Sequence, residues 1–300
     1  MNLTITYLTN RRNCMVEWFV DSCQREISEY GLGLNIRTVM VDFFAKERPR
    51  NNWFSFHVPP KPTVWQGEHK LTKIDYFAPS NARNTALCLA PDGWLLVVDD
   101  LSVLMPGYLK AVREGMDRGY GVCGAYKKVS NLYVSKGKVV HCEERPSGVD
   151  TRWSLGRYNE SVWIGGGQMF GCSLCLPVES LLEVNGWDED CDSMGSEDYI
   201  TGIMLERAGQ KLRYDRRMLT FESEELHHIE KPFLRIIKPG NPDRSWVVLN
   251  QVNGGQKTRG GCYYPEGLRE VRRKVLAGEP FPFYGQPSHD WFDNQPLSQM

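Results

Sequence analysis

The chain has 300 residues, of which 41% are hydrophobic and 24% charged, a composition typical of a globular protein with a buried core. This composition excludes a collagen, a coiled coil and a disulfide-rich miniprotein. The 36 basic and 37 acidic side chains give a formal net charge of -1, which removes the global electrostatic case for a dedicated nucleic-acid or anionic-membrane binder.

Neither a leader nor a membrane span is visible in the sequence. The first residues run into a strand pattern without a basic region or a cleavage site, and no apolar stretch of about 18 residues occurs. The nine cysteines are an odd number and are scattered, which fits reduced thiols better than a disulfide framework. We therefore expect a soluble, cytoplasmic protein with structural cysteines.

The amino-terminal segment alternates strand and helix patterns. Residues 3–8 alternate as a strand, and a helix follows, with Asn13 as its expected cap and Gly31 as its stop. A second strand is predicted over 36–42. The Pro- and aromatic-rich interval 48–65 is too long and irregular for a simple connection, so we expect a surface excursion.

The alternation continues with a helix near 81–90, an apolar strand over 94–98, a helix over 106–118 and a strand near 121–129. Alternating strands and helices with buried strands predict an α/β fold, with a mostly parallel sheet covered by helices on both faces.

The carboxyl-terminal half continues with a hairpin over 131–143, a flexible loop over 144–160 and an apolar strand over 168–176. A short helix follows, and then a helix from the cap Ser196 to Ala208.

Beyond His228 the composition changes to Pro, Gly and aromatic residues, with one amphipathic helix near 265–277. We place a domain boundary there, which gives a domain over 1–228 and an irregular extension over 229–300.

Three carboxylates follow the ends of predicted strands, namely Asp42, Asp99 and Asp100. Because ligands bind beyond the carboxyl ends of parallel strands, we expect these side chains to converge on one crevice. The Asp99–Asp100 pair is suited to a hard divalent cation that bridges the oxygens of a diphosphate. The alternative is that one aspartate caps a turn and the other is solvated.

Two further groups carry potential chemistry. Glu197 and Asp198 stand at a helix start, where the helix dipole favours acids without any function. His227 and His228 are adjacent, and imidazole is a common partner of carboxylates around Mn²⁺-like ions.

Together these features resemble the nucleotide-sugar-dependent glycosyltransferases of the GT-A (Rossmann-like) fold, close to family 2 and with a galactosyltransferase-type carboxyl-terminal pattern. The resemblance covers the chain from about Leu3 to His228. The segments that match the family pattern are, in chain order, 5–11, 82–84, Asp99-Asp100, Pro106-Gly107, 165–167, 185–189 and 195–198. The pattern departs from the family at Leu101, which stands at the usual third position of the DxD motif, and at Met194, where an aromatic residue is usual.

The resemblance implies transfer of a sugar from a nucleoside diphosphate sugar to a hydroxyl acceptor. The donor-binding residues that it implies are Thr9, Arg11, Asp42, Arg83, Asp99, Asp100 and Trp187. It implies that Mn²⁺ or Mg²⁺ is held by Asp99, Asp100 and either His227 or His228 and stabilises the leaving diphosphate.

Asp198 is the expected general base, so that the anomeric carbon inverts, and Glu197 is expected to orient a sugar or acceptor hydroxyl. For Arg83 the alternative is a buried ion pair with Asp42 or Asp99, and for Trp187 a place in the core.

Two other functions stay open. A nucleotidyltransferase also uses acidic metal ligands on an α/β fold, but the loop 9–13 lacks the glycines of a phosphate loop. A non-catalytic nucleotide-sugar-binding module is the other.

The acceptor is not readable, and we consider a glycan and a hydroxylated base in nucleic acid. Basic and aromatic residues in the extension could bind a phosphorylated acceptor, including a nucleic acid with a hydroxylated base; the alternative is a simply solvated helix. These residues are Lys257, Arg259, Tyr263, Tyr264, Arg269, Arg272 and Arg273.

Overall fold

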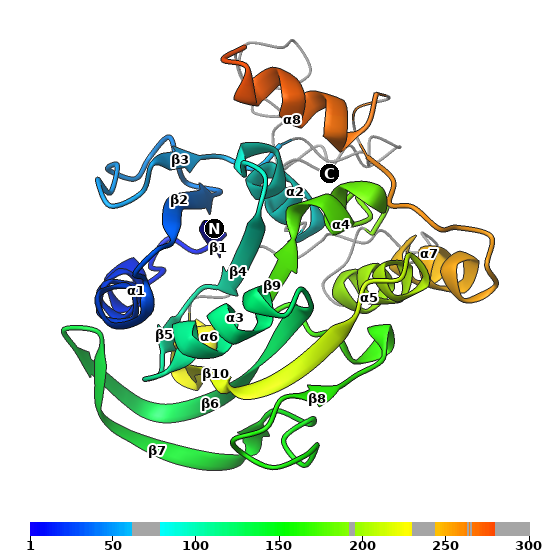
Figure 1. Ribbon diagram of the computed structural model, residues 1–300. Helices are drawn as coiled ribbons and strands as arrows, with labels where there is room; N and C mark the ends of the chain where they lie inside the picture. Colours follow the sequence, from blue (N-terminus) through cyan, green and yellow to red (C-terminus); the bar gives the residue numbers. More distant parts are fainter. Residues whose placement is uncertain (62–78, 192–195, 230–243, 263, 265, 280–300) are drawn as a thin grey trace.

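A computed structural model describes residues 1–61, 79–191, 196–229, 244–262, 264 and 266–279. One twisted sheet forms its centre (Figure 1). The neighbouring strands in this sheet are, in order, β3 (Phe56–Val58), β2 (Asn35–Asp42), β1 (Asn2–Thr9), β4 (Trp94–Asp99), β9 (Ser173–Pro177), β6 (Gly121–Ser135), β10 (Leu212–Ser223) and β5 (Ser102–Leu104).

Most of these strands share one direction. Strands β3, β2, β1, β4, β6 and β10 run parallel to one another, whereas β9 lies antiparallel between β4 and β6, and β5 lies antiparallel beside β10. The mostly parallel α/β sheet that the alternation predicts is therefore confirmed.

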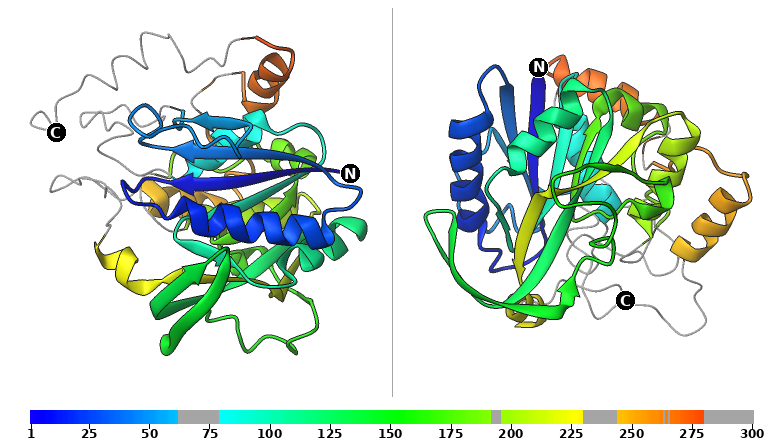
Figure 2. Two further views of the ribbon diagram at one scale, coloured as in Figure 1. Left: turned by 90° about the vertical axis from the view of Figure 1, so that its left-hand side faces the viewer. Right: turned by 60° about the horizontal axis from the view of Figure 1, so that its bottom comes forward.

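Helices cover both faces of the sheet. Helices α1 (Val16–Tyr30) and α3 (Tyr108–Asp117) pack on one face, and Figure 2 shows α1 along that side. The opposite face is covered by α2 (Pro79–Leu89), α4 (Val178–Glu183) and α5 (Glu197–Arg207).

The sequence of β4 explains this double coverage. Its central side chains are all apolar, and successive side chains of a strand point to opposite faces. Leu95 and Val97 therefore belong to one buried cluster, and Leu96 and Val98 belong to the other.

Strands β6 and β7 (Lys138–Val149) form a long hairpin whose tip lies at the predicted turn. The tip packs on α1, since a Cβ atom on Gly137 would lie 2.3 Å from the backbone nitrogen of Ser22. The flexible loop predicted over 144–160 is wrong in its first part, because β7 continues until Val149 pairs with Lys127. The exposed residues of β7 are mostly polar, which hides the strand in the sequence.

Two predicted caps differ from the structure in detail. The N-cap of α1 is Met15 and not Asn13. Ser196 is the N-cap of α5 as predicted, but its φ is 73° and its side chain makes no capping hydrogen bond.

The strand predicted over 168–176 begins only at Ser173, because the glycine-rich segment before it forms a 3₁₀ turn, η1 (Gly166–Gln168). A further short strand, β8 (Val162–Trp163), pairs antiparallel with β10.

The described part of the carboxyl-terminal extension packs on the sheet domain. Helix α6 (Glu224–Ile229) follows β10, α7 (Arg244–Asn253) contacts α5, and α8 (Leu268–Leu276) contacts α2. Val248 of α7 and Leu268 of α8 belong to the same buried cluster as α2, α4 and α5. The division at residue 228 remains a prediction.

One arginine of α8 is buried, although the amphipathic pattern of the helix predicts an exposed position. Arg272 is buried, where its Nε donates to the carbonyl oxygen of Ala90 at 2.7 Å and its Nη2 pairs with Asp92 at 2.6 Å. Arg272 is therefore neither solvated nor open to an acceptor, which were the two alternatives considered for it from the sequence. Across the described residues, every helix is too short or too polar to cross a bilayer.

Candidate active site

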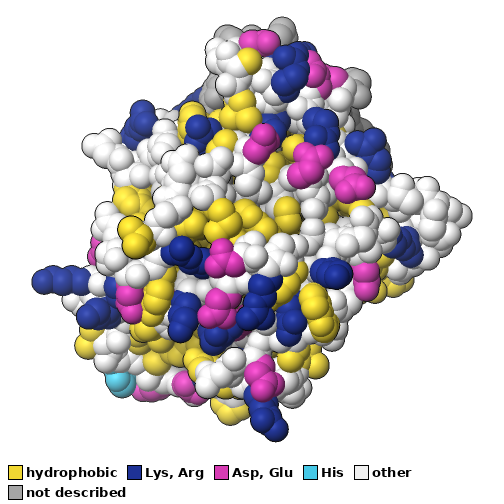
Figure 3. All heavy atoms as spheres, in the orientation of Figure 1, with side chains coloured by type: hydrophobic (Ala, Val, Ile, Leu, Met, Phe, Trp, Pro, Cys, Tyr) yellow, Lys and Arg dark blue, Asp and Glu magenta, His cyan; other side chains and the backbone are white. Residues whose placement is uncertain are grey.

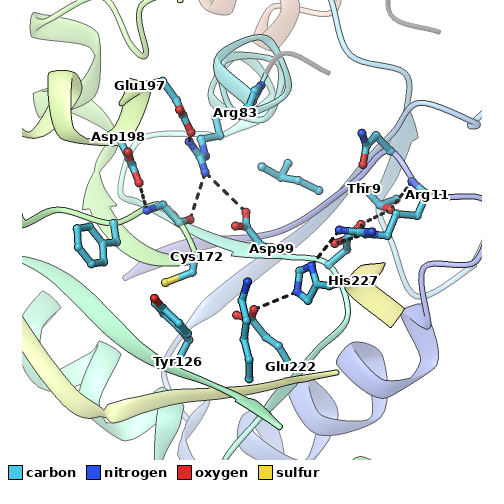
Figure 4. A pocket seen from close by; sticks show the side chains of 17 residues that line it. Thr9, Arg11, Arg83, Asp99, Tyr126, Cys172, Glu197, Asp198, Glu222 and His227 are labelled. Carbon is cyan, nitrogen blue, oxygen red and sulfur yellow. Dashed lines mark hydrogen bonds and ion pairs between the residues drawn. The ribbon is translucent and has the colours of Figure 1, made fainter. Parts of the chain in front are cut away.

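A cavity of about 340 Å³ opens at the edge of the sheet where β1 and β4 end (Figure 4). Residues from distant parts of the chain meet in it. The charged side chains and the imidazole that line it belong to Arg11, Arg83, Asp99, Asp100, Lys128, Glu197, Asp198, Glu222 and His227.

Strand register explains why two of these segments meet. Strands β1 and β4 are parallel neighbours, with Leu8 opposite Asp99. The residues that follow the two strands therefore share one edge of the sheet, which places Thr9 and Arg11 beside Asp100.

Both carboxylate oxygens of Asp100 accept hydrogen bonds from protein groups. The Nε atom of Arg11 lies 3.0 Å from each oxygen, and the hydroxyl of Thr9 donates to Oδ2 at 2.8 Å. The Arg11 and Asp100 side chains are only 5% and 9% exposed. Asp100 is thus an anchor for Arg11.

His227 continues this network. The Nη2 atom of Arg11 lies 3.1 Å from His227 Nδ1, and His227 Nε2 lies 3.3 Å from an oxygen of Glu222. A guanidinium only donates, so Nδ1 is the acceptor and Nε2 carries the proton that is donated to Glu222. The chain Asp100, Arg11, His227 and Glu222 is therefore connected by hydrogen bonds.

Asp99 is the more open member of the aspartate pair. Its side chain is 42% exposed toward the cavity and lies 3.6 Å from Nη2 of Arg83. Burial among protein groups raises the pKa of Asp99 to about 7; Arg83 opposes this rise, whereas Glu222 and Asp100 add to it. The pKa of the Asp99 carboxyl group is therefore shifted toward neutral pH.

Arg83 joins the two sides of the cavity. Its Nη1 donates to Glu197 at 2.7 Å, and its Nη2 donates to the carbonyl oxygen of Gly171 at 3.4 Å. Burial acts to lower the pKa of Arg83, but Glu197 and Asp99 raise it overall. The ion pair with Asp99 that was considered from the sequence is present, although Asp99 itself is partly exposed, and a closer and fully buried pair forms with Glu197.

Asp198 lies at the start of α5, across the cavity from Arg11 and His227 (Figure 4). One oxygen accepts a hydrogen bond from the backbone N–H of Gly171, and the other accepts one from the N–H of Tyr199 at 2.8 Å. These two donors fix the orientation of the carboxylate. Phe170 and Tyr126 also line the cavity.

Three predicted site residues do not line the cavity. Asp42 is fully buried beneath Arg48 and His57, with contacts of 2.7 and 3.0 Å. Trp187 has no exposed surface and lies in the core, the alternative considered for it. His228 is 72% exposed and pairs with Glu224. The resemblance places these three residues at the donor or metal site, but their side chains point elsewhere because of the residues that pack around them.

Several predicted positions lie outside the described residues, namely Met194, Gly195 and Tyr263. The glycine segment 165–167 is described and packs closely, since a Cβ atom on Gly166 would lie 2.2 Å from the carbonyl oxygen of Gly202 in α5.

Sequence reasoning missed several lining residues, among them Tyr126, Lys128, Phe170 and Glu222. Lys128 and Glu222 are register partners in the parallel pair of β6 and β10. A signal existed, because both residues are charged and interrupt apolar strand patterns. The sequence alone does not show that β6 and β10 are neighbours, so it could not place these two residues at the same site.

The predicted metal ligands do not form one set. Within the parts of the chain that the structure describes, no group of three or more His, Cys, Asp or Glu side chains could hold a metal ion. The oxygens of Asp100 bind Arg11 and Thr9, His227 is hydrogen-bonded at both ring nitrogens, and His228 points elsewhere. The ligand set implied by the resemblance does not fit this geometry.

The surface shows no field of a single sign on the face in Figure 3, where basic and acidic side chains are interspersed. On α8, Arg269 pairs with Glu179 at 2.6 Å and Arg273 pairs with Glu270 at 2.7 Å. The exposed cations of this helix are therefore partly neutralised by neighbours.

Comparisons with known proteins inform the fold. No protein-family model and no curated protein matches the chain. Among solved structures, S. aureus TarS 1-349 in complex with UDP has a TM-score of 0.54 at 11% identity, covering 100% of this chain and 77% of that chain.

A longer S. aureus TarS chain has a TM-score of 0.51 at 11% identity, again covering 100% of this chain but only 46% of its own length. The chain thus spans about half of that TarS chain. At this identity the likeness concerns the fold alone, and it confirms the GT-A arrangement predicted from the sequence.

Proposed function

We propose that the protein is a glycosyltransferase that moves a sugar from a nucleoside diphosphate sugar to a hydroxyl acceptor. The observation that carries the proposal is the convergence of Asp99, Arg83 and Asp198 on one cavity at the carboxyl edge of a GT-A sheet. The UDP complex of TarS, which has the same fold, supports a nucleotide as part of the donor.

Asp198 is the proposed general base. The acceptor hydroxyl attacks the anomeric carbon while its proton passes to Asp198, and the bond from that carbon to the diphosphate breaks. The electron pair of this bond leaves with the nucleoside diphosphate. Attack opposite to the leaving group inverts the anomeric configuration.

Glu197 has a position suited to holding a hydroxyl group. Its Oε1 binds Arg83, and its Oε2 is buried at the cavity without a hydrogen-bond partner among the described residues. A buried acceptor without a donor is costly, so we propose that Glu197 turns toward the cavity when the substrates bind and accepts a hydrogen bond from a sugar or acceptor hydroxyl.

The Mn²⁺ or Mg²⁺ requirement remains a prediction. Because the implied ligands do not gather, no step of the mechanism is assigned to a metal here. The assay below is therefore run with Mn²⁺ and with a chelator.

The decisive experiment measures what the protein does to nucleotide sugars. UDP, GDP, CDP and TDP sugars are first screened by thermal shift, because a ligand that binds the native state raises the melting temperature. Release of nucleoside diphosphate from the donor that binds supports transfer. Pyrophosphate exchange would instead indicate a nucleotidyltransferase, and binding with neither reaction would indicate a binding module.

The first prediction concerns Asp198→Asn. Loss of the base should lower the turnover number by about 10²- to 10⁴-fold and leave the donor dissociation constant largely unchanged. Asp117→Asn, an exposed acid on α3, is the matched control. Retained turnover in Asp198→Asn would discard the assignment of the base.

A second screen tests the two classes of acceptor that the sequence leaves open. Glycans and DNA that contains hydroxymethylated bases are offered together with the donor that binds, and sugar incorporation is followed by mass spectrometry. The paired arginines of α8 weigh against a strong electrostatic DNA surface there.

A further inference from the structure

The cavity has an excess of acidic groups, which poses an electrostatic problem for a diphosphate. Five carboxylates line it, namely Asp99, Asp100, Glu197, Asp198 and Glu222. An incoming anion is repelled by the carboxylates that have no positive partner. Diphosphate binding therefore needs a cationic group that no acid already neutralises.

Two of the three Lys and Arg side chains that line the cavity are already paired with carboxylates. Arg11 lies against both oxygens of Asp100, and its Nη2 contacts His227. Arg83 pairs with Glu197 at 2.7 Å and lies 3.6 Å from Asp99. Each of these guanidiniums mainly offsets a carboxylate beside it.

Lys128 is the third. It lies on β6 in register with Glu222 of the parallel strand β10, so both side chains rise from the same face of the sheet into the cavity. The structure shows no hydrogen bond or ion pair from Lys128 to any described residue, and its side chain is half-buried. Its ammonium group is thus a positive charge with no described partner.

The backbone around Lys128 is closely packed. A Cβ atom on Gly148 in β7 would lie 2.1 Å from the carbonyl oxygen of Lys128. Only glycine allows β7 to approach this closely, and the contact fixes the strand from which the lysine projects. The backbone of Lys128 is therefore held in place, while its ammonium group has no partner among the described residues.

We propose that Lys128 binds the diphosphate of the nucleotide donor and stabilises the charge that develops on it as the bond to the sugar breaks. This inference rests on the proposed function. A lysine ammonium acts on phosphate as a compact point charge and donates hydrogen bonds to its oxygens. The electron pair of the broken bond goes to the diphosphate oxygen, and Lys128 keeps its proton.

The test compares a charged ligand with its neutral counterpart. UDP, GDP, CDP and TDP, each with its nucleoside, are titrated calorimetrically into wild-type protein and Lys128→Met, with Mn²⁺ and with EDTA. Lys128→Met should weaken binding of the cognate diphosphate by at least about tenfold, because a charge-assisted hydrogen bond is lost. Binding of the uncharged nucleoside should be unchanged.

Two further variants complete the design. Lys128→Arg keeps the charge and should retain most of the diphosphate affinity. Lys138→Met removes an exposed lysine from the same hairpin and should behave as wild type. Should Lys128→Met fold poorly in a thermal unfolding control, Lys128→Gln serves in its place.

The outcomes separate this inference from the proposed function. If wild-type protein binds none of the four diphosphates, the proposed function fails. If wild-type protein binds one of them and Lys128→Met binds it equally well, Lys128 has no such role. Equal weakening of diphosphate and nucleoside would assign Lys128 a structural role and also overturn the inference.

Discussion

At the scale of single residues, the cavity is organised by two arginines that hold acids in place. Arg11 orients Asp100, and Arg83 orients Glu197 while approaching Asp99. Such buried pairs set geometry more than they add stability, because desolvation of both charges offsets much of their attraction. Removing one partner is a different matter, since the other charge is then left buried and alone.

Arg83→Met should therefore destabilise the protein strongly. Glu197 would lose its partner at a site where both side chains are about 5% exposed or less, and such losses cost about 3–5 kcal/mol. Urea unfolding followed by circular dichroism measures the change. The double variant Arg83→Met/Glu197→Gln should recover part of the loss, whereas a single-variant cost below about 1 kcal/mol would contradict the buried pairing.

Asp99 should make the stability of the protein depend on pH. Burial raises the pKa of Asp99 to about 7 in the folded protein, whereas an unfolded aspartate titrates near about 3.9. Between these values the folded state holds a proton that the unfolded state has released, so this contribution to stability is present at low pH and declines as pH rises to about 7. Relative to Asp99→Asn, the wild-type melting temperature should therefore fall between about pH 5 and about pH 7.5.

The control for this titration is Asp117→Asn, which removes an exposed acid outside the cavity. Its melting temperature should follow that of the wild type across the same pH range. A wild-type curve parallel to that of Asp99→Asn would contradict the raised pKa.

At the scale of elements, the amino-terminal strands and helices were predictable, as was a strand near β9, but the reversed direction of β9 was not. The apolar run of β4 and the helical spacing in α1 are local signals, and both elements occur where predicted. The direction of β9 and the length of β7 depend on partners far away in sequence, so local periodicity could not supply them. For the same reason, the sequence did not show that Lys128 and Glu222 lie side by side at the cavity.

Helix α8 offers a test of how the extension contributes to the domain. Leu268 has no exposed surface and packs in the main core cluster, so Leu268→Ala should cost about 2–5 kcal/mol of unfolding free energy. Leu276→Ala on the same helix is the control, because that side chain is 39% exposed and its loss should cost little. Equal small effects, measured by urea denaturation, would show that α8 adds little to the stability of the domain.

At the scale of the whole molecule, the motifs placed most of the site but not its internal chemistry. Thr9, Arg11, Arg83, Asp99, Asp100, Glu197, Asp198 and His227 all line one cavity. A motif marks a position along the chain, but the direction of a side chain depends on its neighbours. Asp100 faces Arg11, and Trp187 faces the core, for reasons that only the assembled sheet contains.

The reversed strand β9 has one more consequence. It starts at the edge where its neighbours end, so the short segment before it contacts both sides of the cavity: the N–H of Gly171 donates to Asp198, and the carbonyl of Cys172 accepts from the N–H of Asp99 at 3.1 Å. These two adjacent residues therefore connect Asp99 with Asp198, the base of the proposed reaction. Under that proposal, an insertion between Gly171 and Cys172 would change the separation of the two carboxyl groups, and with it the size of acceptor that fits between them.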